Sequence, residues 1–347
     1  MSLGLLKQAL WSGIATAWHL SGAARARNRG QVAILTYHRV LSPAELRTEV
    51  VQPGMYVLAD TFAMQMEFLR RHFLVLSFDD LLTRWADGRW DTRRPACVIT
   101  FDDGWLDNLR HAAPVLKRLD LPATIFLPTD FIGTARWFWP EQLGVYLRTA
   151  GGHPESKRTA MYDALQAAMR EAWPNAASRV FPHDISAAVA DDVIDACKQL
   201  DHGRLVTMLD SLCARFAVTM PASRVTIDWD EVREMSRQGI AFGSHSCSHR
   251  LLDGLSADEC RREAQASLAT LRANGARVTP VFCYPNGNFN STAQEAVRAA
   301  GYEAAVSCQP GLEGATPSDR FALRRVSLHQ DISATPALYA MALAGLR

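Results

Sequence analysis

The sequence predicts an α/β protein built on a mostly parallel sheet, either open or closed into a barrel. Short apolar runs rich in β-forming residues recur along the chain, and segments with helical periodicity separate them. Runs such as residues 31–37 and 97–101 are apolar almost throughout, which is typical of strands buried on both faces. With 48% hydrophobic and 21% charged residues, the chain has the composition of a globular protein.

The expected elements alternate along most of the chain. The expected strands cover residues 31–37, 73–77, 97–101, 123–127, 240–243, 278–284 and 303–307. The expected helices cover residues 61–72 with Thr61 as N-cap, 78–85, 106–119, 229–238, 257–274 and 292–300. The alternation breaks at residues 132–224, which are rich in Ala, Leu and Arg. Because a loop of that length is improbable inside a compact domain, we expect a helical insertion with its own packing.

The expected domain organisation has three parts: an N-terminal helix at residues 1–30, one α/β domain formed by residues 31–131 and 225–347, and the insertion at 132–224. Apolar residues recur at helical spacing near the N-terminus, as Leu3, Leu6, Leu10, Ile14 and Ala17. Docking of this amphipathic helix on its own domain is the simplest interpretation. A helix on a membrane surface and an export signal are the alternatives, although the basic residues follow the apolar segment.

Charge and cysteine content narrow the function classes. Lys and Arg total 37 against 36 Asp and Glu, a net charge of +1, which disfavours a nucleic-acid partner. The seven cysteines are an odd number and never spaced as CxxC, so neither a disulfide framework nor a thiolate zinc site is indicated. We therefore expect a cytoplasmic protein, with possible membrane association through residues 3–24.

Polar residues follow three of the expected strands. Asp102 and Asp103 come after residues 97–101, His245 and His249 come after 240–243, and a Pro/Gly turn at 285–287 comes after 278–284. Functional residues of parallel α/β sheets collect at the carboxyl ends of strands. Taken alone, the paired acids could form a turn and the two histidines could be incidental. Their joint occurrence at strand ends favours a functional site.

These side chains suit a catalytic metal. Adjacent carboxylates in a low-dielectric pocket repel each other unless a positive charge lies nearby. Asp103 can ligate a cation while Asp102 faces a water molecule, and His245 and His249 can reach the same ion from one turn. Three protein ligands leave a coordination position open, as in catalytic zinc sites.

The motifs carry a family resemblance. TFDDG at residues 100–104, HSCSH at 245–249 and FCYPNG at 282–287 resemble three motifs of the NodB-homology polysaccharide deacetylases, carbohydrate esterase family 4. The resemblance implies a distorted (β/α) barrel of about seven strands, a divalent metal held by Asp103, His245 and His249, and Asp102 as general base. It also implies removal of N-acetyl groups from sugars, with release of acetate.

The third motif departs from the family pattern. Cys283 replaces the arginine that keeps the base carboxylate ionised, and Arg324 and Arg325 are the available substitutes, with Arg325 preferred. His329 and His38 are rival candidates for the general acid. Backbone N–H groups near Tyr284 and Pro285 are expected to stabilise the oxyanion.

Trp137 and Trp139, near the start of the insertion, either stack on a sugar ring or anchor the insertion by packing.

The expected function is therefore metal-dependent N-deacetylation of a bacterial polysaccharide or glycan precursor. O-deacetylation and non-catalytic carbohydrate binding are the alternatives. Zn²⁺ is the expected metal, and Co²⁺, Ni²⁺ and Fe²⁺ have similar ligand preferences. The expected partner is an N-acetylated sugar or polysaccharide.

Overall fold

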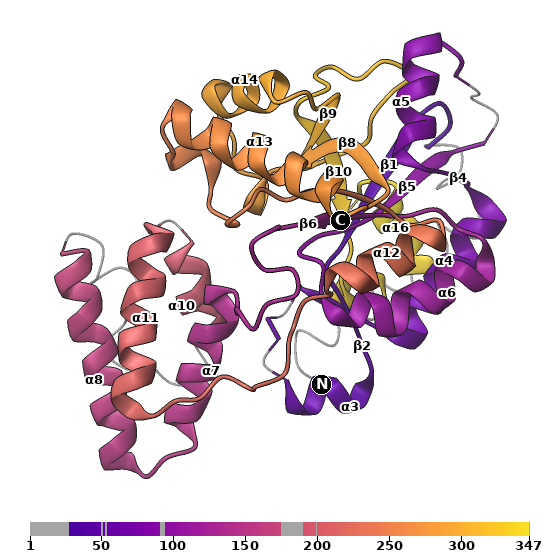
Figure 1. Ribbon diagram of the computed structural model, residues 1–347. Helices are drawn as coiled ribbons and strands as arrows, with labels where there is room; N and C mark the ends of the chain where they lie inside the picture. The colour runs from indigo at the N-terminus through magenta and orange to yellow at the C-terminus, as the bar shows by residue number, and fades with distance from the viewer. Residues whose placement is uncertain are drawn as a thin grey trace. The chain divides into compact units, whose positions relative to one another are not determined.

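The computed structural model describes residues 28–49, 51–52, 54–90, 94–174, 190–198 and 200–346 (Figure 1). The expected N-terminal helix and its membrane contact fall almost wholly on residues 1–27, which lie outside the described residues. Within the described part of the chain, no helix combines the length and the apolar character needed to cross a membrane.

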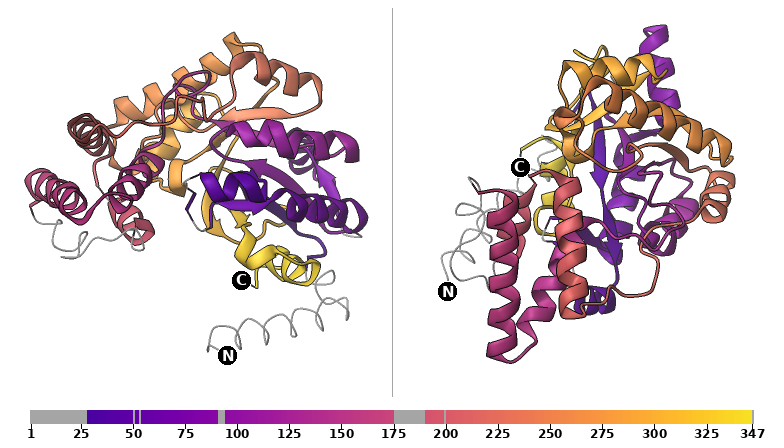
Figure 2. Two further views of the ribbon diagram at one scale, coloured as in Figure 1. Left: turned by 90° about the horizontal axis from the view of Figure 1, so that it is seen from below. Right: turned by 60° about the vertical axis from the view of Figure 1, so that its left-hand side comes forward.

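Seven parallel strands close into a barrel, which confirms the predicted fold class (Figures 1 and 2). In ring order they are β1 (Val32–Tyr37), β10 (Leu323–Ser327), β9 (Ala304–Pro310), β8 (Val278–Cys283), β7 (Ala241–Ser244), β6 (Thr124–Leu127) and β5 (Ala96–Phe101). The ring closes because β1 pairs with β10 on one side and with β5 on the other. An eighth strand, β4 (Leu74–Leu76), pairs with the first half of β5. Strand β6 pairs only with the last two residues of β5, so the barrel is irregular between β5 and β6.

Side chains of the barrel strands alternate between two hydrophobic clusters. Val32 and Ile34 of β1 belong to a cluster shared with inward residues of other strands, such as Phe126. Ala33 and Leu35 belong to a second cluster, shared with the helices around the barrel. This alternation follows from the two-residue period of a strand and fixes which side chains can reach the barrel interior.

The helices expected at residues 61–72, 78–85, 106–119, 229–238, 257–274 and 292–300 begin and end close to those positions, and the structure adds helices at 43–48, 330–333 and 336–343 that the sequence did not predict. In chain order they are α3 (Pro43–Thr48), α4 (Ala59–His72), α5 (Phe78–Asp87), η1 (Asn108–Ala112), α6 (Ala113–Leu119), α12 (Trp229–Arg237), α13 (Ala257–Ala273), α14 (Ser291–Ala299), α15 (Gln330–Ser333) and α16 (Pro336–Leu343). The expectation that Thr61 caps α4 is wrong, because the helix begins two residues earlier with Leu58 as its N-cap and Thr61 is buried inside it. Two short strands, β2 (Arg39–Leu41) and β3 (Tyr56–Leu58), form a separate parallel pair.

Residues Leu46–Pro53 and Ala135–Val225 form a second compact unit. Its helices are α7 (Trp139–Gly151), α8 (Glu155–Ala172), α10 (Ala190–Cys197) and α11 (His202–Phe216). Buried residues from all four helices, among them Leu143, Leu165, Ile194 and Leu209, form a core of their own. This core makes the insertion a folded unit rather than a long loop.

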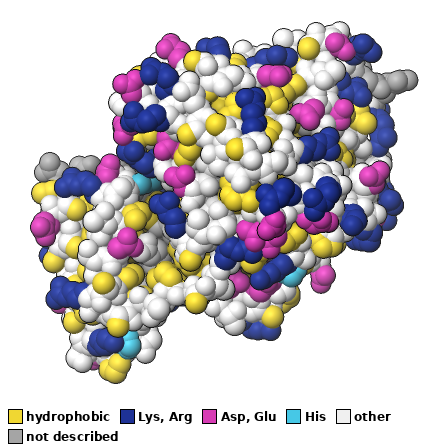
Figure 3. Space-filling view, in the orientation of Figure 1, with side chains coloured by type: hydrophobic (Ala, Val, Ile, Leu, Met, Phe, Trp, Pro, Cys, Tyr) yellow, Lys and Arg dark blue, Asp and Glu magenta, His cyan; other side chains and the backbone are white. Residues whose placement is uncertain are grey.

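The surface carries both signs of charge. On the face shown in Figure 3, basic and acidic side chains are interspersed. This distribution agrees with the near-zero net charge of the sequence.

Candidate active site and metal centre

The turn after β5 carries the two carboxylates and has an unusual backbone conformation. Asp103 (φ 72°) and Gly104 (φ 66°) both occupy the left-handed region, which non-glycine residues rarely adopt. A Cβ atom at position 104 would lie 2.5 Å from Cδ2 of Leu127, so any other residue there would force Leu127 to shift and would also strain the backbone. The strand therefore ends in a strained turn at the site where the sequence predicts chemistry.

The structure brings Asp103, His245 and His249 together. Asp103 Oδ1 lies 3.2 Å from Nε2 of His249 and 3.5 Å from Nε2 of His245. One ligand atom from each of the three residues lies within 4.8 Å of the others. Asp103 and His245 are buried, and His249 is half-buried. Burial alone would raise the pKa of Asp103, but the two imidazoles hold it well below its usual value.

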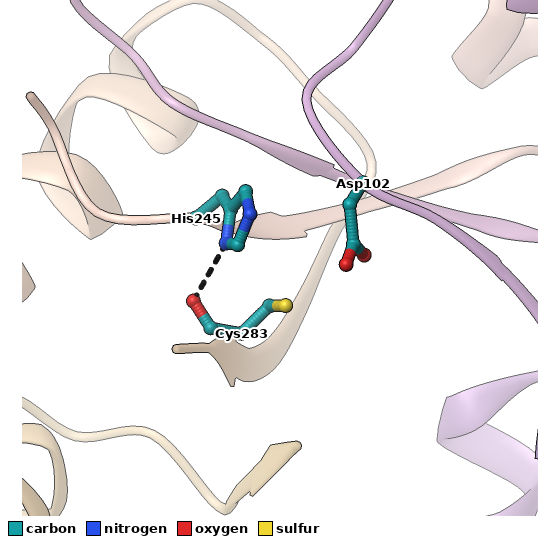
Figure 4. A group of neighbouring side chains, drawn as sticks. All are labelled: Asp102, His245 and Cys283. Carbon is teal, nitrogen blue, oxygen red and sulfur yellow. Dashed lines mark hydrogen bonds between the residues drawn. The ribbon is translucent and has the colours of Figure 1, made fainter. Parts of the chain in front are cut away.

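His245 is oriented by a hydrogen bond on its far side. Nδ1 lies 2.8 Å from the backbone carbonyl oxygen of Cys283 (Figure 4). A carbonyl oxygen only accepts, so Nδ1 carries the proton of this bond and the opposite nitrogen, Nε2, faces Asp103. Burial would lower the pKa of His245, but its neighbours, including Asp103, raise it well above its usual value. The electrostatic environment that attracts a proton also attracts a metal cation.

The loop between the two histidines is held by Glu263, which none of the sequence motifs includes. The carboxylate of Glu263, on α13, accepts hydrogen bonds from the backbone N–H of Cys247 (2.8 Å) and of Ser248 (3.0 Å), and from the Ser248 hydroxyl (2.5 Å). His249, at the end of this loop, has a φ of 60°, in the left-handed region that non-glycine residues rarely adopt. Glu263 lies on a helix beyond the motif, so no local pattern identifies it.

Asp102 forms a buried, bidentate ion pair with Arg325. Nη1 donates to Oδ1 at 2.8 Å and Nη2 donates to Oδ2 at 2.9 Å, and both side chains are at most 2% exposed. Burial raises the pKa of Asp102, but the Arg325 guanidinium, together with His245 and His38, holds the pKa below its ordinary value. Of the two arginines expected as substitutes for the missing motif arginine, Arg325 therefore contacts Asp102, whereas Arg324 pairs with Glu313.

Asp102, His245 and Cys283 form a second cluster of possible metal ligands (Figure 4). Both carboxylate oxygens of Asp102 already accept hydrogen bonds from Arg325. Burial raises the pKa of the Cys283 thiol to about 11, so the sulfur is protonated near neutral pH. The cluster of Asp103, His245 and His249 is the better cation site.

The two candidates for the general acid have different neighbours. Nε2 of His38 lies 3.8 Å from Oδ2 of Asp102, and burial lowers the pKa of His38 despite the opposing effect of the nearby carboxylates. His329 precedes α15, and its Nδ1 lies 3.5 Å from Oδ2 of Asp331. The structure therefore places His38 beside Asp102.

The structure corrects one expectation about substrate contacts and decides between two alternatives for another. The backbone N–H of Tyr284 donates to the carbonyl oxygen of Val306 (3.2 Å), and Pro285 has no N–H, so neither supplies the expected oxyanion donor. Trp139 is 6% exposed in the core of the helical unit, so it packs and does not offer a face to a sugar. Trp137 is half-buried and its role as a sugar platform stays a prediction.

Comparisons with known proteins agree with these motifs. A family model described as polysaccharide deacetylase matches residues 89–171 and 192–305. The Bacillus subtilis (strain 168) protein YxkH, named as a polysaccharide deacetylase, is 27% identical over 104 residues. That match covers 30% of this chain and 37% of YxkH, so it spans little more than a third of the relative's length.

Solved structures share the fold. The Streptococcus pyogenes deacetylase PplD aligns over 90% of this chain and 99% of its own, with a TM-score of 0.56 and 17% identity. IcaB from Ammonifex degensii aligns over 92% of this chain and 98% of its own, with a TM-score of 0.55 and 17% identity.

Proposed function

Because this chain belongs to the polysaccharide deacetylase family, we propose that it is a metal-dependent hydrolase that removes N-acetyl groups from a bacterial polysaccharide or glycan precursor. One observation carries the proposal: Asp103, His245 and His249 converge beside a second carboxylate, Asp102, that is buried, paired with Arg325 and not needed as a ligand. A purely structural metal site has no use for such a carboxylate.

The residues present fit a divalent cation. Asp103 and the two histidines are one hard and two borderline ligands, a set suited to Zn²⁺ and close to the preferences of Co²⁺, Ni²⁺ and Fe²⁺. The hydrogen bond from His245 to the Cys283 carbonyl is the outer contact that metal-ligating histidines usually make. A divalent cation supplies Lewis acidity, which lowers the pKa of water and polarises a carbonyl oxygen.

Asp102 is the proposed general base. Its depressed pKa keeps it ionised at neutral pH, and Arg325 fixes the plane of the carboxylate through two hydrogen bonds. An ionised carboxylate in this position can take the proton of the water that attacks the acetyl carbon. Cleavage of the amide C–N bond then yields acetate and a free amine on the sugar.

Protonation of the departing amine requires an acid. His38 is the better-placed candidate, because its Nε2 lies 3.8 Å from the carboxylate that receives the first proton. His329 is the alternative. The solved PplD structure contains acetate, the product that we propose for this chain.

Product analysis tests the proposal. The zinc-loaded protein is incubated with oligosaccharides carrying either N-acetyl or O-acetyl groups, and acetate and new amines are quantified. We expect acetate and amine in equal amounts from the N-acetylated set, and loss of both with Asp102→Asn. Acetate released only from the O-acetylated set would identify an esterase, and no release from either would favour a binding function. The expected cytoplasmic location stays a separate prediction.

A further inference from the structure

Trp105 lies one residue beyond the strained turn and contacts the proposed metal ligand. Its indole Nε1–H donates to Oδ2 of Asp103 at 2.9 Å. The indole ring is 2% exposed. Its backbone forms an antiparallel bridge with Thr226, which fixes the Trp105 end of the contact.

The face of the indole is covered by Arg39. The guanidinium carbon of Arg39 lies 4.6 Å from the ring centroid. Arg39 Nε in turn donates to Oδ2 of Asp107 (2.8 Å), whose Oδ1 accepts the backbone N–H of Val40 (2.7 Å). Arg39 and Asp107 are both buried. This arrangement restrains the ring and therefore the direction of its N–H.

The hydrogen bond from Trp105 gives the two carboxylate oxygens of Asp103 different partners. Oδ2 accepts from the indole, whereas Oδ1 lies closest to the two imidazole Nε2 atoms. Indole donates but never accepts and does not titrate in the neutral range, so this bond persists across pH. A carboxylate without that partner could rotate, and its buried Oδ2 would lack a donor.

We propose that Trp105 is a positioning residue for the metal centre, which holds Oδ2 of Asp103 and presents Oδ1 toward the cation. The inference rests on the proposed metal site. Outer contacts of this kind typically contribute 10-fold to 100-fold to metal affinity. Trp105→Phe keeps an aromatic ring and removes the donor, so it should weaken zinc binding by about that factor.

Trp85 provides a matched control. It is 9% exposed, belongs to the same barrel unit, and donates its indole N–H to the carbonyl oxygen of Gly314 at 3.0 Å. Trp85→Phe therefore loses a comparable ring and a comparable hydrogen bond, but not one that involves a metal ligand. A general loss of stability would affect both variants, whereas a positioning role affects only Trp105→Phe.

The experiment measures the Zn²⁺ dissociation constant by competition with a chromophoric chelator, together with the melting temperature and the visible spectrum of the Co²⁺ form. We expect a 10-fold to 100-fold weaker Zn²⁺ affinity and an altered Co²⁺ spectrum for Trp105→Phe, and wild-type values for Trp85→Phe. Tight wild-type binding with an unchanged Trp105→Phe variant would overturn this inference alone. A wild-type protein that binds no zinc would overturn the proposed metal site and this inference with it.

The wild-type protein provides a second test if Trp105→Phe does not fold. With ¹⁵N-labelled indole groups, zinc should shift one indole N–H resonance upfield, because a cation on the carboxylate weakens the hydrogen bond that it accepts. Indole resonances that all stay in place on zinc saturation would contradict the proposal.

Discussion

Arg325→Met removes the guanidinium that pairs with Asp102 and leaves the negative charge of a buried carboxylate without a cationic partner. The lost contacts are two charge-assisted hydrogen bonds to Asp102 and the Nε bond to the Ser307 carbonyl (2.7 Å). Removal of one partner from a buried ion pair costs about 3–5 kcal/mol. At about 2 °C per kcal/mol for a domain of this size, we expect the melting temperature to fall by about 6–10 °C.

The same substitution changes the pH dependence of activity. In the wild type, Arg325 holds the pKa of Asp102 below its ordinary value, so the base is ionised throughout the neutral range. Without the guanidinium, burial dominates and the pKa of Asp102 rises. The acid limb of the kcat/KM profile should therefore move to higher pH, and the stability contributed by the pair should be absent at neutral pH.

The assay combines thermal unfolding with a pH profile of acetate release. Arg324→Met is the matched control, because Arg324 pairs with Glu313 and should alter stability without moving the acid limb. In the Asp102→Asn/Arg325→Met double variant, the neutral amide should recover part of the lost stability. An unmoved acid limb in Arg325→Met, or a double variant no more stable than the single one, would show that Arg325 does not keep Asp102 ionised.

Three substitutions, one of them with a matched control, test other parts of the site. Asp102→Asn should retain bound metal and lower turnover by ~10² to ~10⁴, as measured by metal analysis and initial rates; near-wild-type turnover excludes the base assignment. Gly104→Ala should cost about 2–4 kcal/mol in chemical denaturation, because it adds a clash with Leu127 to the left-handed φ. Gly88 has a similar φ and open space around it, so Gly88→Ala should cost only about 1–2 kcal/mol. Equal losses of stability in the two variants would show that the clash with Leu127 contributes little. Glu263→Gln should lower the free energy of unfolding by about 1–3 kcal/mol and weaken Zn²⁺ binding. Unchanged zinc affinity would show that Glu263 stabilises the loop without affecting the metal ligands.

The barrel could be predicted because most of its strands are continuous apolar runs. Strand β10 is the exception, since Arg324 and Arg325 occupy its centre and hide the apolar pattern. The three-residue strands β2 and β3 are too short to give a periodic signal. The N-cap of α4 was misplaced because the helix begins at Ala59 without a side-chain cap.

The residues at the centre of the site could be predicted from the sequence for a related reason. Asp102, Asp103 and His245 directly follow buried strands, and parallel strands deliver such residues to one end of a barrel. Trp105 and Glu263 contact the site through tertiary packing that no spacing encodes. Tyr284 was misassigned because its N–H is used by the strand pairing with Val306, which depends on register.

We propose that Asp103, His245 and His249 hold the metal on which deacetylation depends. This proposal is tested most directly by measuring metal content and acetate release on the same preparations of wild type and His245→Ala. We expect about one bound divalent ion per wild-type chain. His245→Ala should lose most of the metal and nearly all of the acetate release, while wild-type activity should disappear with a chelator and return with Zn²⁺. Wild-type metal content in His245→Ala, or full acetate release from metal-free protein, would contradict it.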